Sequence, residues 1–199
     1  SLWLHTCRTG RKLNDLSDNI KCGNSLITEE FDWEREFPFG GFDVVLGNPP
    51  YVQLQTMGKM SDRYAQCGFE VYNKSADLYC LFAERGYKLL KEGGLLSFIM
   101  PNKWMLVDYG KPLRAFLAKS GLRRILNFGD IQFFKDATTN CCIFVTGKRE
   151  RTDTVKALSV NQETWTGNFD AEVQKCFDCS AYDFTEKEWI IIPRTRSEI

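Results

Sequence analysis

Residues 42–51 read Phe-Asp-Val-Val-Leu-Gly-Asn-Pro-Pro-Tyr, and the rest of the predicted fold is arranged around this segment. The apolar run at its start predicts a buried strand. Pro49 and Pro50 have no N–H to donate to a neighbouring strand, so the strand has to end before them. Gly47 is expected to let the backbone turn at that point. Because ligands of open α/β sheets bind beyond the carboxyl ends of the strands, residues 48–51 are expected to lie at a ligand site.

The residue types that follow this strand suit a planar base that carries an exocyclic amine. Asn48 offers an acceptor oxygen and an NH₂ donor. The prolines leave carbonyl groups without competing N–H groups, and Tyr51 adds a flat face with a polar tip. The alternative interpretation is a plain strand-to-loop turn, since Asn and Pro are common turn residues.

Length and charge narrow the class of protein. The chain has 199 residues, enough for one domain with a small appendage. Its 26 Lys and Arg balance 26 Asp and Glu, which disfavours a pure nucleic-acid-binding module but leaves open an enzyme that touches DNA through one face. No run approaches the ~20 apolar residues of a membrane span, and the N-terminus lacks a signal-peptide pattern. We therefore predict a soluble, cytoplasmic protein without a membrane partner.

The eight cysteines do not form a metal-binding pattern. Only Cys176 and Cys179 have C-x-x-C spacing, no second pair joins them, and the single histidine is His5. We predict no metal site and expect reduced thiols that pack as small hydrophobic side chains.

The apolar patterns along the rest of the chain predict an α/β fold. A continuous apolar run at 95–100 ends at Pro101 and predicts a strand covered on both faces, as in a parallel sheet. The link between the strands expected at 122–128 and 140–146 is too short for a crossover helix, so that pair should be antiparallel. Further strands are expected at 19–22 and 154–159, helices at 76–92 and 111–120, a short helix or loop at 29–41, and irregular chain at 52–74.

Taken in order, these pieces resemble the gamma-class N6-adenine DNA methyltransferases, in particular the type IIG restriction–modification enzymes. The resemblance rests on Gly-Asn-Ser-Leu at 23–26, Asn-Pro-Pro-Tyr at 48–51, Asp-Leu-Tyr at 77–79 and the loop at 132–139. It implies a partial Rossmann-like, S-adenosylmethionine-dependent methyltransferase fold. The implied sheet is mostly parallel with an antiparallel final strand.

The resemblance also implies a division of the chain. Residues 1–147 would be a truncated methyltransferase catalytic domain with motifs III to VIII, and 148–199 a small appendage leading toward a target-recognition domain. The family's glycine-rich motif I and its acidic ribose-binding residue would precede residue 1, so the N-terminal strands and half of the cofactor site would be missing. The fragment would then be inactive alone.

The function implied by the resemblance is adenine-specific, site-specific DNA methylation by the full-length parent. A methyl group would move from S-adenosylmethionine to N6 of an adenine flipped out of double-stranded DNA. The implied catalytic residues are Asn48, Pro49, Pro50 and Tyr51. Tyr51 and Phe134 would stack on the base, and Asn24, Asn48 and Asp77 would contact the cofactor.

Several alternatives stay open from the residues alone. Asn24 is also a good turn cap and Asp77 a good helix cap, and Phe134 or its neighbour Phe133 also suits a hydrophobic core. The substrate could instead be a protein glutamine or RNA, or the chain could be a non-enzymatic interaction piece. The sequence has no convincing Asp…Glu-x-Lys cluster, so we predict no DNA cleavage by this chain.

Overall fold

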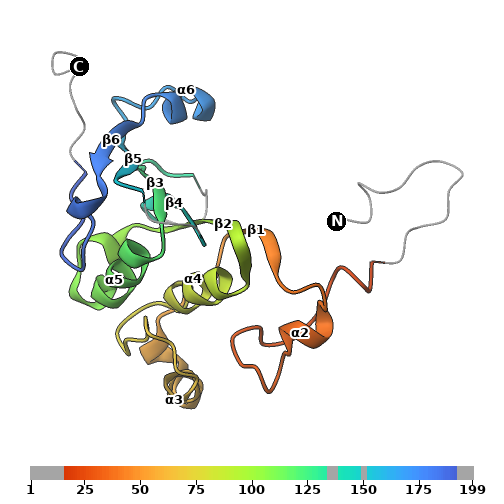
Figure 1. Ribbon diagram of the computed structural model, residues 1–199. Coiled ribbons are helices and arrows are strands. Elements are labelled where there is room, and N and C mark those ends of the chain that lie inside the picture. The colour runs from red at the N-terminus through yellow and green to blue at the C-terminus, as the bar shows by residue number, and fades with distance from the viewer. Residues whose placement is uncertain (1–15, 134–138, 149–151, 192–199) are drawn as a thin grey trace, which may run out of the picture.

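The computed structural model describes residues 16–133, 139–148 and 152–191. Its centre is a six-stranded sheet in the order β1-β2-β4-β3-β5-β6 (Figure 1). The strands are β1 (Phe42–Gly47), β2 (Leu90–Pro101), β3 (Leu122–Asn127), β4 (Cys141–Gly147), β5 (Thr154–Ser159) and β6 (Phe177–Ser180).

The directions of the strands confirm the predicted α/β class. β1 is parallel to β2, and β3 is parallel to β5. β4 is antiparallel to both β2 and β3, and β6 is antiparallel to β5. Four strands, β1, β2, β3 and β5, therefore share one direction, and the antiparallel pair β3–β4 is the one that the short connection predicted.

Two helices cover one face of the sheet, α4 (Leu78–Lys88) and α5 (Lys111–Lys119) (Figure 1). They contact each other through the rings of Tyr87 and Phe116, whose centroids are 5.3 Å apart. The shorter helices are α2 (Trp33–Glu36), α3 (Lys59–Gln66) and α6 (Phe169–Gln174), with 3₁₀ turns η1 (Leu54–Met57), η2 (Lys103–Met105), η3 (Asp108–Gly110) and η4 (Ala181–Asp183).

Burial along β2 alternates, which corrects the expectation of a strand covered on both faces. Leu96, Phe98 and Met100 are buried in the core under the helices, while the residues between them are half-buried. The second apolar layer lies instead over β3 and β5. It contains Leu126, Phe128, Ile131, Leu158 and Val160, with Trp165 and Val173 packed against them.

The predicted strand at 19–22 is wrong. The backbone N–H groups of Asn19 and Ile20 both donate to the Leu16 carbonyl, so residue 19 ends a turn, and residues 20–22 are irregular chain. A strand needs a neighbour that takes its backbone hydrogen bonds, and the described residues place none beside it. Lys21 instead forms an ion pair with Glu36 of α2, with 3.4 Å between the charged atoms.

Two other boundaries differ from the sequence expectation. Residues 52–74 are not wholly irregular, because they contain η1 and α3. The segment after α4 becomes a strand already at Leu90, so the Gly93–Gly94 pair lies inside β2. Gly93 has a φ of 81°, in the left-handed region that glycine tolerates, and the pairing of β1 with β2 is irregular there.

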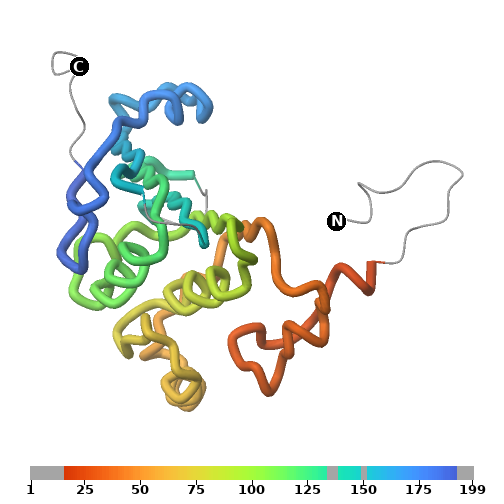
Figure 2. The backbone as a smooth tube through the Cα atoms, viewed as in Figure 1, coloured from red at the N-terminus to blue at the C-terminus, as the bar shows by residue number. Residues whose placement is uncertain are grey.

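The C-terminal residues extend the same sheet. The strand predicted at 154–159 is confirmed as β5, which pairs with β3. The chain then returns to the helical side, where Trp189 donates its backbone N–H to Met105 and its ring centroid lies 5.2 Å from that of Trp104. Figure 2 shows residues 16–41 and this C-terminal segment at opposite sides of the sheet. None of the described helices is long and apolar enough to cross a membrane.

Candidate active site

The residues after β1 lie at the carboxyl edge of the parallel pair β1–β2. Gly47 is aligned with Phe98 of β2 at that edge. Asn48 and Pro50 are exposed, Pro49 is buried and Tyr51 is half-buried, so the carboxamide is open to solvent while the buried Pro49 holds the adjoining backbone. The prediction that the strand ends at 47 and presents residue 48 is confirmed. The prediction that this strand is buried is wrong, because β1 lies at the edge of the sheet, where Val44 and Leu46 are exposed and none of its residues is buried.

Gly47 has a different role from the one predicted. Its φ does not lie in the left-handed region. A Cβ atom at this position would lie 2.7 Å from Cε1 of Phe98, which is closer than side chains tolerate. Glycine is therefore needed here because the backbone of β1 passes close to the Phe98 ring, and not because the chain turns.

Tyr51 contacts Asn48 directly. Its hydroxyl donates to Oδ1 of Asn48 at 2.6 Å, and its ring meets the Tyr79 ring edge to face at 6.3 Å. Burial, together with the nearby thiols of Cys141 and Cys142, raises the pKa of the Tyr51 hydroxyl above its usual value. Tyr51 is therefore a neutral hydrogen-bond donor that holds the Asn48 carboxamide in one orientation.

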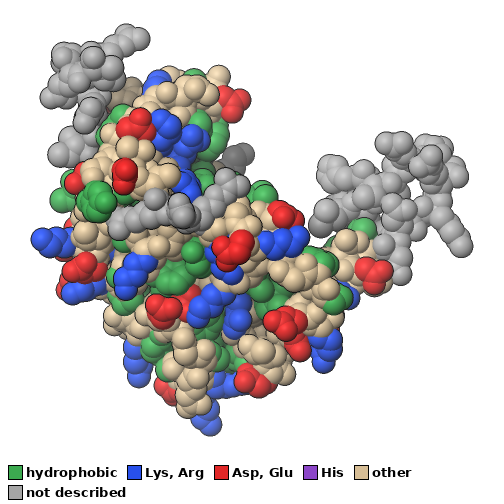
Figure 3. Space-filling view, viewed as in Figure 1, with side chains coloured by type: hydrophobic (Ala, Val, Ile, Leu, Met, Phe, Trp, Pro, Cys, Tyr) green, Lys and Arg blue, Asp and Glu red, His purple; other side chains and the backbone are tan. Residues whose placement is uncertain are grey.

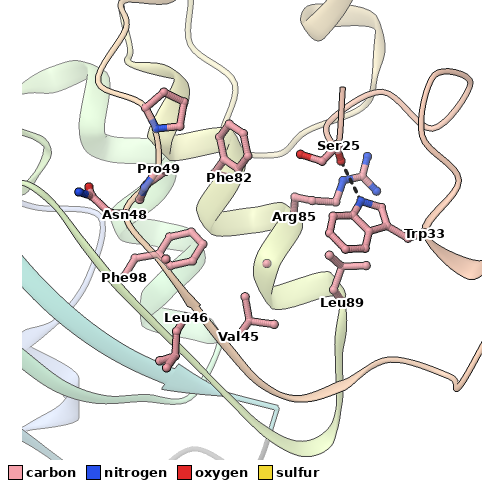
Figure 4. A pocket seen from close by; sticks show the side chains of 13 residues that line it. Ser25, Trp33, Val45, Leu46, Asn48, Pro49, Phe82, Arg85, Leu89 and Phe98 are labelled. Atoms are coloured by element: carbon pink, nitrogen blue, oxygen red, sulfur yellow. Dashed lines mark hydrogen bonds between the residues drawn. The ribbon is translucent and has the colours of Figure 1, made fainter. Parts of the chain in front are cut away.

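A pocket of about 280 Å³ opens beside Asn48 (Figure 4). Its wall is mostly apolar and aromatic, with a few polar groups from separate segments. The polar groups come from Ser25, Asn48 and Arg85, and Trp33 forms one aromatic edge. The apolar part of the wall is formed by Val45, Leu46, Pro49, Pro50, Phe82, Gly86, Leu89 and Phe98. Such a lining suits a flat aromatic ligand that is oriented by a small number of hydrogen bonds.

Not all the predicted site residues reach this pocket. Asn48, Pro49 and Pro50 line it, whereas Asn24, Tyr51 and Asp77 do not. Asn24 accepts from the N–H of Leu26 at 3.3 Å and donates to the Tyr64 hydroxyl at 3.3 Å, so its amide is engaged in the local turn.

Asp77 occupies the N-cap position of α4, but its side chain makes no capping hydrogen bond. Its carboxylate instead accepts from the Tyr109 hydroxyl at 3.3 Å. The Tyr109 hydroxyl also lies 3.1 Å from that of Tyr79, which is fully buried. Burial raises the pKa of Tyr109 to about 12 and that of Tyr79 still further. Asp77 therefore holds Tyr109, which in turn contacts Tyr79, the residue whose ring meets the Tyr51 ring.

Of the two adjacent phenylalanines in the 132–139 loop, Phe134 lies outside the described residues. Phe133 packs edge to face on Phe128 at 4.8 Å and on Trp165 at 5.6 Å. Phe133 thus packs against the second apolar layer over β3 and β5, with 38% of its surface exposed.

The sequence patterns missed Ser25, Trp33, Phe82 and Arg85. Phe82 and Arg85 appear in the sequence as one stripe of a helix and indicate only a buried face. Their place in the pocket depends on how α4 packs against β1, which periodicity does not reveal. A polar Arg85 within that apolar stripe is the one available signal.

Among the described residues no cluster of His, Cys, Asp and Glu could hold a metal ion. Cys80, Cys141 and Cys142 are buried thiols in the core. Burial raises the pKa of each of them, so they remain protonated.

Comparison with known protein families assigns the chain to one of them. The sequence model of the Eco57I restriction-modification methylases matches residues 1–134, well over half of the 199 residues. The chain belongs to the Eco57I restriction-modification methylase family.

This Eco57I-family chain is 36% identical over 146 residues to the type II restriction enzyme and methyltransferase RM.Eco57I of Escherichia coli. The match covers 67% of the chain and 15% of that relative. It is 35% identical over 137 residues to the type II methyltransferase M.BanIII of Aneurinibacillus aneurinilyticus, covering 67% of the chain and 23% of the relative. The chain thus spans less than a quarter of the length of either relative.

Solved structures share the fold of this Eco57I-family chain. The type IIL restriction-modification enzyme MmeI, solved in complex with DNA, matches 83% of the chain and 22% of its own chain, with a TM-score of 0.57 and 15% identity. The type I methyltransferase subunit from Streptococcus thermophilus matches 79% of the chain and 38% of its own, with a TM-score of 0.56 and 19% identity. At these identities the likeness concerns the fold alone.

Proposed function

We propose that this chain forms the amine-activating part of a DNA methyltransferase that methylates N6 of adenine within a restriction–modification system. The observation that carries the proposal is the exposed carboxamide of Asn48, held at the carboxyl end of β1 by Tyr51 and flanked by a pocket of aromatic and apolar side chains. Membership of a methylase family supports the reaction class.

Asn48 suits the activation of an aromatic amine. The lone pair of such an amine is delocalised into the ring, so the nitrogen is a poor nucleophile until its hydrogens are bonded to acceptors. The Asn48 oxygen has two lone pairs, and Tyr51 takes one of them. The other lone pair and the Pro49 carbonyl are proposed to accept the two N6 hydrogens, which localises the lone pair of the amine toward the methyl donor.

The pocket fits part of S-adenosylmethionine. Its volume of about 280 Å³ is just below the usual range of about 300–1,000 Å³ for ligand pockets, so it suits one portion of the cofactor, not the whole. The adenine ring is the flat aromatic portion, and Phe82 together with Pro49 would pack against it. When bound, the cofactor supplies a methyl group on a positively charged sulfur. The contacts proposed from the resemblance for Asn24 and Asp77 would be indirect, since both side chains contact other residues.

The target adenine is proposed to stack on Tyr51 after leaving the duplex. Stacking of a base on an aromatic side chain contributes roughly 1–3 kcal/mol, which offsets part of the cost of flipping. Phe134 remains our candidate for the opposite face, since its neighbour Phe133 packs on Phe128 and Trp165.

Double-stranded DNA is the proposed partner, although the charge of the chain does not mark a DNA-binding face. Net charge is zero, and on the face seen in Figure 3 the basic and acidic side chains are interspersed. We propose that residues 1–147 are the catalytic domain and that much of the DNA contact and the sequence recognition come from a domain that follows residue 199. We also propose that the enzyme acts in the cytoplasm.

The test is to identify the methylated product. The full-length gene product is incubated with S-adenosylmethionine carrying a labelled methyl group and, in separate reactions, with DNA, RNA and a glutamine-containing peptide. We expect label in DNA alone, recovered after digestion as N6-methyladenine. Label in cytosine, in RNA or in the peptide, or no transfer to any acceptor, would contradict the proposal.

A further inference from the structure

The backbone of Ser25 and Leu26 is held at the pocket by two side chains from different elements. The indole Nε1 of Trp33, the first residue of α2, donates to the Ser25 carbonyl at 2.9 Å. Nη2 of Arg85, from the last turn of α4, donates to the Leu26 carbonyl at 2.9 Å. Both side chains also line the pocket, and Figure 4 shows Arg85 reaching toward Ser25 and Trp33.

Trp33 is itself fixed in place. Asp32 caps α2 by accepting from two backbone N–H groups at the start of this helix. The Trp33 ring also meets the Phe42 ring of β1 edge to face at 5.9 Å. The two carbonyls of the 25–26 turn are therefore tied to the strand that carries Asn48 on one side and to the helix that carries Phe82 on the other.

Arg85 is an unusual choice for a purely structural position. Burial lowers the pKa of its guanidinium, and its Nε–H is buried without a hydrogen-bond partner in the described part of the chain. The guanidinium lies 5.4 Å from the centroid of the Phe69 ring. An apolar side chain of similar length would fill this space without leaving a buried donor unpaired, so the donor groups of Arg85 call for an explanation.

We propose that Arg85 and Trp33 are positioning residues that fix the Ser25–Leu26 backbone at the pocket and thereby make it selective for the hydrogen-bonding edge of adenine. This inference rests on the proposed function. The edge of adenine presents an exocyclic amine beside an acceptor nitrogen, and a rigid turn can read this pattern with its backbone and hydroxyl groups. A turn that is free to move accepts either an amine or an oxo group at that position.

The test compares two ligands that differ only at this edge, S-adenosylhomocysteine and S-inosylhomocysteine, in which an oxo group replaces the adenine amine. Calorimetric titration of each ligand into the full-length gene product gives the ratio of their Kd values. We expect wild type to prefer the adenine ligand. Arg85→Met removes the donors and should reduce that preference about tenfold, the effect of losing roughly one hydrogen bond, mainly by weakening the adenine ligand.

Trp33→Phe keeps an aromatic ring but removes the N–H, and it should reduce the preference in the same direction even if Arg85→Met folds poorly. Arg85→Lys retains one charged donor and should keep most of the preference. Arg63→Met is the matched control, because Arg63 is an exposed arginine that pairs with Glu30 away from the pocket; its ratio should equal that of wild type.

An unchanged ratio in Trp33→Phe and Arg85→Met, or an equal loss of affinity for both ligands, would overturn the positioning role. A wild-type protein that binds neither ligand would instead contradict the proposed function itself, and the inference with it.

Discussion

Asn48 and Tyr51 form the smallest unit of the proposed site. The Tyr51 hydroxyl uses one lone pair of the Asn48 oxygen and leaves the other for a substrate, while the Tyr51 ring offers a stacking face. The Tyr51 hydroxyl therefore orients the Asn48 carboxamide, while the Tyr51 ring stacks on the substrate base. Removing only the hydroxyl, or the whole ring, separates these two contributions.

We expect Tyr51→Phe to lower the rate of methyl transfer by about tenfold, the effect of losing one hydrogen bond that orients the carboxamide. Tyr51→Ala should cost more and should also weaken retention of the flipped base, because roughly 1–3 kcal/mol of stacking is lost. Single-turnover rates and the fluorescence of 2-aminopurine at the target position measure the two effects. Equal rates for both variants and wild type would remove Tyr51 from the site.

The pH dependence of the transfer step follows from the same residues. The pKa values of Tyr51, Cys141 and Cys142 are all raised by burial, so each group keeps its proton in the neutral range. The proposed activation by Asn48 uses a neutral amide. We expect the single-turnover rate to be flat between about pH 6.5 and 8.5, well below the pKa of tyrosine. A rate that rises tenfold per pH unit within this window would indicate a titrating base and contradict the mechanism.

At the scale of elements, the close approach of β1 to β2 shapes the pocket. Gly47→Ala would place a Cβ atom 2.7 Å from the buried Phe98 ring. We expect a loss of about 1–3 kcal/mol in the free energy of unfolding, the usual cost of overpacking, measured by urea denaturation. Val44→Ala on the same strand is the control, since Val44 is 55% exposed and its replacement should change stability by less than about 0.5 kcal/mol. Equal free energies of unfolding for wild type and Gly47→Ala would show that the Phe98 ring moves aside without loss of stability, contrary to this prediction.

The strands that a local apolar pattern marks could be predicted from the sequence. Features that depend on contacts with segments distant in the sequence could not. Residues 42–47 and 154–159 form strands because apolar, β-branched runs are bounded by proline or charged residues. Residues 19–22 show a weaker version of that pattern, but no described strand lies beside them, and they form the end of a turn followed by irregular chain. The position of Asn48 at the carboxyl end of a strand could be predicted from the sequence, because Pro49 ends the strand there. The places of Ser25, Trp33 and Phe82 depend on tertiary packing, which no local pattern encodes.

At the scale of the whole molecule, Arg114 connects the helical layer to the C-terminal segment. Its side chain is 2% exposed and donates to the carbonyls of Trp104, Val107 and Glu186. Trp189 of the same segment packs against Trp104. The C-terminal residues are thereby tied to the core that also supports the sheet.

We expect Arg114→Met to lower the free energy of unfolding by about 2–4 kcal/mol, because three carbonyls lose a charged donor. Urea denaturation followed by tryptophan fluorescence measures this loss, and Trp104 and Trp189 are two of the five tryptophans that contribute to the signal. Lys111→Met serves as the control, since Lys111 is exposed on the same helix. Equal stability of the two variants would show that water replaces the guanidinium without penalty.

In the proposed mechanism the Asn48 carboxamide activates the target amine. The most direct measurement is the single-turnover rate of methyl transfer to DNA by the full-length gene product carrying Asn48→Ala, with cofactor affinity measured on the same protein. Gln66→Ala, which removes an exposed amide from α3, is the matched control. We predict a loss of at least about 100-fold in rate for Asn48→Ala, with cofactor affinity largely retained. A near-normal rate, or a loss explained entirely by weaker cofactor binding, would contradict the account.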